Sequence, residues 1–187
     1  MSVGPVLGAL RSATGPLHDA LEARTQALSR LLCREGRAGY VAALHSAYAP
    51  LEAALEPWLI DEAGLDFAGR RKLSFLAEDL EALGRAAPQD ADLTELHLSA
   101  PRALGLQYVL EGATLGARVL AREVRSAGGD LRGLSFFNCY GAEAGARFRA
   151  FCDVLEGRPD ETDEIIAGAV LGFQIMDAAL APEGALQ

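Results

Sequence analysis

The sequence contains few cysteines, and their placement excludes two common uses of that residue. Cys33, Cys139 and Cys152 are odd in number and far apart, and none belongs to a C-x-x-C pair. A disulfide framework needs paired cysteines, and a structural zinc site needs clustered ligands. We therefore expect reduced thiols and a cytoplasmic protein, because free thiols persist in reducing compartments.

Long apolar runs and positive charge are also scarce. No stretch reaches the roughly 20 apolar residues of a membrane span, and the N-terminal segment MSVGPVLGALRSATG lacks a basic region followed by an apolar run. Lys and Arg number 17 against 26 Asp and Glu, a formal net charge of −9. Phosphate backbones and anionic lipids attract basic faces, so we expect neither nucleic acid nor a membrane as a partner.

β-Branched residues are sparse, while alanine, leucine, glutamate and arginine dominate. This composition favours helices, and no stretch alternates convincingly as a strand. We find no repeat and no second domain, so 1–187 is expected to be a single-domain, all-α multi-helix bundle. The spacing predicts helices over 14–32, 40–55, 70–83, 101 to Gly128-Gly129, 142–155 and 160–180, with turns at 36–39 and 134–140 and frayed last residues.

The helix expected over 104–124 contains an anomaly. One face is apolar, and Glu111 falls on the opposite, solvated face. Gly112 and Gly116 stand one turn apart, and each costs about 1 kcal/mol against alanine in a helix interior; Gly105 and Tyr108 extend their stripe. Two explanations are open. Small residues four apart are typical of a close helix crossing, which is the better explanation from this stretch alone. Alternatively, they leave room for a flat ligand.

The usual catalytic and metal-binding motifs are absent. There is no G-x-S-x-G, no P-loop and no dinucleotide fingerprint. None of the three histidines, His18, His45 and His97, follows a glutamate by three residues, which disfavours a ferritin-like dinuclear site. A single histidine does suit haem, because the porphyrin supplies the other nitrogen ligands. Arg11 precedes His18 by two helical turns and would suit the haem propionates.

Three segments resemble those of bacterial haem oxygenases. The segment LRSATGPLHDALE, 10–22, resembles their proximal-helix motif, and YVLEGATLGARVLA, 108–121, resembles their distal-helix motif. A third segment, SFFNCYGAEAGARFRAF at 135–151, is similar to a later family segment rich in aromatic and basic residues. The resemblance spans nearly the whole chain, in the order and separation that the family has, and is closest to the short soluble type found beside bacteriophytochromes.

The resemblance implies a fold and a reaction. The fold is an all-α bundle that sandwiches haem between a proximal and a distal helix. The reaction is a monooxygenase reaction that opens haem to biliverdin and releases carbon monoxide and ferrous iron. It consumes O2 and electrons from an external donor, a reductase or a ferredoxin. A bacteriophytochrome is an expected recipient of the biliverdin.

The resemblance also implies roles for single residues. His18 would be the axial ligand of the haem iron. Arg11 and Tyr108 match positions near the propionates, with Arg147 and Arg149 as additional cofactor-binding residues.

On the distal side, Gly112 and Gly116 would let the helix backbone cover the haem, leaving ordered water as the proton source. Many family members have an aspartate after the first glycine, where this chain has Ala113, and Thr114 is the expected catalytic substitute. Two alternatives stay open. Ala113 would favour a haem-binding protein of the same fold without turnover, and a glycine pair that is only a crossing would favour a cofactor-free helical interaction module.

Overall fold

The computed structural model describes residues 4–181, and every regular element in this range is helical. The α-helices are α1 (Pro5–Thr25), α2 (Ala27–Leu32), α3 (Arg34–Leu59), α4 (Leu73–Leu83), α5 (Ala100–Ser126), α6 (Ala144–Glu156) and α7 (Thr162–Leu180). Short 3-10 turns are η1 (Ala68–Arg70), η2 (Phe136–Asn138), η3 (Gly141–Glu143) and η4 (Pro159–Glu161). The expected all-α fold is confirmed. No helix in the described range is long and apolar enough to cross a membrane.

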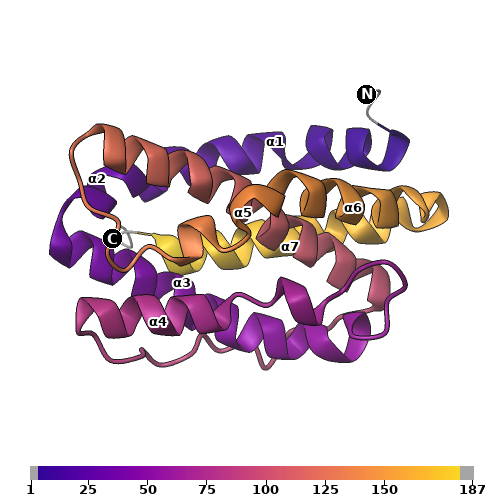
Figure 1. Cartoon of the computed structure of the whole chain (residues 1–187). Helices are drawn as coiled ribbons and strands as arrows, with labels where there is room; N and C mark the ends of the chain where they lie inside the picture. The colour runs from indigo at the N-terminus through magenta and orange to yellow at the C-terminus, as the bar shows by residue number, and fades with distance from the viewer. Residues whose placement is uncertain (1–3, 182–187) are drawn as a thin grey trace.

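Helix α7 occupies the centre of the bundle (Figure 1). Helices α5, α1 and α3 all pack against it, and α4 packs on the far side of α3. The core between these helices is built from leucines and aromatics, with Tyr48, Phe136, Phe137 and Phe151 among its largest fully buried side chains. Both helices of the expected site, α1 and α5, are therefore positioned by the same central helix.

Helices α5 and α7 cross closely, and three glycines make this possible. A Cβ on Gly105 would collide with the carbonyl oxygen of Ile165, and one on Gly168 with the carbonyl oxygen of Arg102. A Cβ on Gly172 would lie 2.9 Å from Val109. The crossing therefore uses Gly105, whereas Gly112 and Gly116, further along the predicted stripe, meet no neighbouring helix.

The first helix differs most from expectation. We predicted a start near Thr14, but α1 begins at Pro5 and contains Pro16 in its interior. Thr14 is buried and donates to the carbonyl oxygen of Leu10 at 2.8 Å, so it is not a cap. The carbonyl that Pro16 leaves without a helical donor belongs to Ser12, which is exposed and open to solvent. Left-handed Gln26 (φ 45°) then separates α1 from α2.

The other helix boundaries differ from prediction by fewer residues. The turn expected at 36–39 is helical, because Cys33 caps α3 earlier by accepting the amide of Gly36 at 3.3 Å. Helix α4 begins three residues later than predicted, at Leu73. Helix α5 begins after its cap Ser99 and ends before left-handed Gly128, as the sequence indicates. Helices α6 and α7 agree with prediction within two residues at each end, and the last residues, 182–187, lie outside the described range.

Candidate functional site

His18 lies on α1 with its ring accessible. The side chain is 55% exposed, and its two ring nitrogens lie 3.6 Å from the carboxylates of Asp19 and Glu22. One edge meets the ring of Phe173 on α7, with centroids 6.3 Å apart and planes at 74°. The aromatic contact restrains the imidazole, while its exposure leaves it free to bind a ligand.

The glycine pair on α5 faces open space. A Cβ on either Gly112 or Gly116 would meet no heavy atom within 4 Å, apart from its own neighbours in the helix. Val119, one turn further along this face, is exposed. A close helix crossing requires backbone contact at the small residues, and here that contact is made by Gly105 instead. The crossing explanation is therefore wrong for Gly112 and Gly116 within residues 4–181.

Arg11 and Tyr108 connect α1 to α5. Burial raises the pKa of Tyr108, and the Arg11 guanidinium, with hydrogen bonding to Thr14 and Arg11, offsets part of that rise. Both helices run in the same direction, from right to left in Figure 1. His18 lies about 10 Å along α1 from Arg11, and Gly116 about 12 Å along α5 from Tyr108, at 1.5 Å per residue.

Arg147 and Arg149 occupy different environments on α6. Phe148 between them packs on Tyr108, with ring centroids 6.4 Å apart. Arg147 donates to the carbonyl oxygen of Gly69 at 2.8 Å and stacks over Tyr140, whereas Arg149 is exposed. The structure places the Arg147 side chain at the partly exposed edge of a polar network, where it also pairs with Asp66 and Glu143.

Thr114 does not share the glycine face. It is buried, and its hydroxyl donates to the carbonyl oxygen of Glu111 at 2.6 Å. Residues 112 and 114 are about 200° apart around a helix. Its side chain therefore lies on the far side of α5 from the space beside Gly112.

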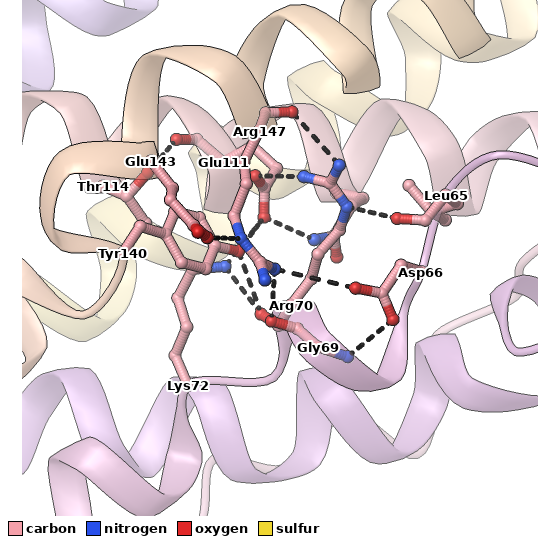
Figure 2. A network of polar contacts seen from close by, with 11 residues as sticks. Leu65, Asp66, Gly69, Arg70, Lys72, Glu111, Thr114, Tyr140, Glu143 and Arg147 are labelled. Atoms are coloured by element: carbon pink, nitrogen blue, oxygen red, sulfur yellow. Dashed lines mark hydrogen bonds and ion pairs between the residues drawn. The ribbon is translucent and has the colours of Figure 1, made fainter.

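Glu111 is the centre of that internal network (Figure 2). We expected it on a solvated face, but it is 0% exposed. Its Oε2 accepts from Arg70 Nη1 at 2.7 Å. Its Oε1 accepts from Lys72 Nζ at 2.9 Å, Tyr140 Oη at 2.8 Å and Gln107 Nε2 at 3.1 Å. Buried charges occur where they are paired and hydrogen-bonded, and this carboxylate has four donors.

The donors to Glu111 are themselves held in place (Figure 2). Arg70 donates through Nε to the carbonyl oxygen of Leu65 and through Nη2 to that of Arg147 at 3.1 Å. Lys72, the only lysine of the chain, is 1% exposed and donates to the carbonyl oxygen of Arg70 at 2.9 Å. Burial and the nearby Glu111 carboxylate raise the pKa of Tyr140, which keeps its phenol a donor.

Three buried polar atoms that accept or donate no hydrogen bond within residues 4–181 lie along α3, one of which, Glu52 Oε2, forms an ion pair with Arg71 at 3.5 Å. His45 Nδ1, Tyr48 Oη and Glu52 Oε2 are buried without a hydrogen-bond partner, at a spacing that places them on one helix face. Burial raises the pKa of both Tyr48 and Glu52. Such atoms are uncommon in folded proteins and are typical sites for ordered water.

The described residues offer no competing metal site. Between residues 4 and 181, no three His, Cys, Asp or Glu side chains converge to hold an ion. Cavities of about 290 Å³ beside Arg37 and Arg132 and about 340 Å³ at 157–161 touch none of the candidate residues. The open face of α5, where the absent glycine side chains leave space for a flat ring, and the accessible imidazole of His18 on α1 are the features that fit a haem.

The chain is similar to known heme oxygenases in sequence and in fold. The chain is 34% identical over 142 residues to a heme oxygenase of Xanthomonas campestris pv. campestris (strain 8004), covering 74% of this chain and 85% of that protein. NO- and CO-bound heme oxygenase from Neisseria meningitidis superimposes with a TM-score of 0.78 at 19% identity over 100% of both chains. Heme oxygenase from Leptospira interrogans gives 0.71 at 18% identity, over 94% and 98%. No family model matches.

Proposed function

Because the chain belongs to the haem oxygenase family, we propose that it opens haem oxidatively to biliverdin, with release of carbon monoxide and ferrous iron. The observations that support this best are the open glycine face of α5 and an accessible histidine on α1. A flat ligand between them would meet an imidazole on one side and bare backbone on the other.

Haem is the substrate and also supplies the redox-active iron. His18 would hold that iron, and a carboxylate 3.6 Å from each ring nitrogen is available to orient whichever nitrogen does not bind. Gly112 and Gly116 would form the opposite wall. A wall without side chains offers no acid or base of its own, so any proton must come from water.

Arg11 and Tyr108 would bind the propionates. The chain carries a net charge of −9, so an anionic ligand edge needs local positive charge. Arg11 supplies that charge, and the raised pKa of Tyr108 keeps its phenol protonated as a hydrogen-bond donor near neutral pH. Arg149, exposed on the same helix as Phe148, is a further candidate.

The reaction also needs O2 and electrons from outside the chain. We propose a reductase or a ferredoxin as the donor and a cytoplasmic location, as the three reduced cysteines suggest. Delivery of biliverdin to a bacteriophytochrome is proposed from the sequence resemblance alone. Co-expression of the phytochrome with this chain tests it, since only a biliverdin supply would give the red-absorbing holoprotein.

A haem-binding protein without turnover is the second candidate. Ala113 stands where many family members have an aspartate, and Thr114 points away from the glycine face. Neither residue offers a polar side chain to hold distal water on that face.

Titration with hemin, followed by a reductant in air, separates the candidates. Haem oxygenase activity gives a bound-hemin spectrum that is replaced by the absorption of biliverdin. Stable hemin binding without biliverdin supports the second candidate, and no hemin binding supports the cofactor-free interaction module.

A further inference from the structure

We propose that Glu111 is a positioning residue, which fixes the glycine wall of α5 against the haem and thereby decides which edge of the ring is opened. This inference rests on the proposed function. Glu111 directly precedes Gly112 in the chain, yet its carboxylate is fully buried on another side of the helix. It therefore acts through the backbone of α5 and not by touching the ligand.

The two faces of α5 are separate. Gln107, Glu111 and Thr114 repeat at helical spacing on the network side, and all three are joined by hydrogen bonds. Gly112 and Gly116 lie roughly 100–140° from Glu111 around the helix. Nothing within 4 Å would meet a Cβ on either glycine, so their own face contributes no packing to this turn. The network adds hydrogen bonds at Glu111 to the apolar packing of α5 on α7.

The network joins α5 to segments that are distant in the chain. Arg70 and Lys72 come from the α3–α4 connection, and Tyr140 from the segment between η2 and η3. Arg70 also donates to the Arg147 carbonyl oxygen of α6, next to Phe148, which packs on Tyr108. Hydrogen bonds of Arg70 thus connect the turn that bears the glycine wall to the part of α6 that packs on Tyr108.

A carboxylate is required for this arrangement. Hydrogen bonds between charged groups are shorter and about twice as strong as neutral ones. A Glu111→Gln side chain would keep the shape but leave the ammonium of Lys72 and the guanidinium of Arg70 without their counter-ion in the protein interior. Such a loss is expected to release or rotate the turn at Gly112.

The experiment compares hemin complexes of the wild type, Glu111→Gln and Tyr140→Phe. Tyr140→Phe removes one of the four donors without changing any charge, so it remains informative if Glu111→Gln does not fold. Asp79→Asn is the matched control: Asp79 is a buried carboxylate that accepts the amides of Ser135 and Phe136, and within residues 4–181 it forms no hydrogen bond or ion pair with Glu111 or its donors.

Two measurements are made on each folded, hemin-loaded protein. The first is the NMR spectrum of the haem methyl groups in the ferric complex, which reports the seating of the ring without turnover. The second is the ratio of biliverdin isomers. We expect Glu111→Gln to change both, with an isomer ratio altered about fivefold or more, Tyr140→Phe to change them less, and Asp79→Asn to lower stability only.

The outcomes separate the two proposals. Unchanged methyl shifts and isomer ratios in both Glu111→Gln and Tyr140→Phe would overturn the positioning role. If the wild type binds hemin but makes no biliverdin, the proposed activity fails and the methyl spectrum alone decides the role of Glu111. If the wild type binds no hemin, both proposals are wrong.

Discussion

Replacing Gly116 by leucine distinguishes a ligand wall from a packed interface, because the two predict opposite changes in the Tm of the apo-protein. A ligand wall predicts a rise, and a packed interface predicts a fall. A Cβ at this position meets nothing within 4 Å. Leucine is a better helix former than glycine by roughly 0.8 kcal/mol. For a chain of this size, 1 kcal/mol corresponds to about 2–4 °C in Tm. We therefore expect the apo Tm of Gly116→Leu to rise by about 2 °C.

The same substitution should impair the loaded protein. A leucine side chain on the glycine face would occupy the space assigned to the haem, so hemin affinity and turnover per folded molecule should both fall by about tenfold or more, the effect of 1.4 kcal/mol. Gly168→Leu is the matched control, since its Cβ would collide with the Arg102 carbonyl oxygen and overpacking costs typically about 1–3 kcal/mol.

Thermal melts of the two apo variants, with hemin titrations of the folded fractions, make the comparison. Gly168→Leu should melt lower than the wild type, and Gly116→Leu should not. If apo Gly116→Leu melts as low as Gly168→Leu while its turnover per folded molecule stays intact, the haem-wall interpretation is refuted.

Two further predictions concern charged groups. Arg11→Ala should weaken hemin binding about two- to fivefold and broaden the biliverdin isomer mixture, whereas the remote exposed variant Arg85→Ala should do neither; equal titrations for the two would remove Arg11 from the site. Glu52 has a pKa raised by burial, so its folded form holds a proton that the unfolded chain releases, and stability is lost as pH rises from the unfolded pKa towards the folded one. The Tm of Glu52→Gln relative to wild type should therefore increase between pH 4 and 7, and a pH-independent difference would contradict this.

The fold could be predicted where apolar spacing is regular. The inward positions Leu106, Val109 and Leu110 of α5 are buried as expected, and its end before Gly128 follows from local backbone chemistry, since Gly128 adopts a positive φ. The start of α1 was missed because Gly15-Pro16 is a strong local helix-start signal. Tertiary packing of Val6, Leu7 and Leu10 overrides it, so the helix continues through Pro16.

Part of the candidate site could be proposed from the sequence. The glycines at 112 and 116 are unusual inside a helix, and His18 is one of only three histidines in the chain. Glu111 was missed because a buried acidic residue looks like a solvated one in a helical pattern. Its partners Arg70 and Lys72 lie about 40 residues away in the chain, and only the fold brings them together.

The absorption spectrum of hemin bound to the wild type and to His18→Ala, followed through reduction in air, tests the central claim most directly. We predict that the wild type shows a bound-hemin spectrum that gives way to biliverdin. His18→Ala should lose the ligated spectrum and nearly all turnover, with added imidazole partly restoring the spectrum. The opposite result, in which His18→Ala behaves as the wild type and His45→Ala or His97→Ala loses the spectrum, would contradict the placement of haem between α1 and the glycine face of α5.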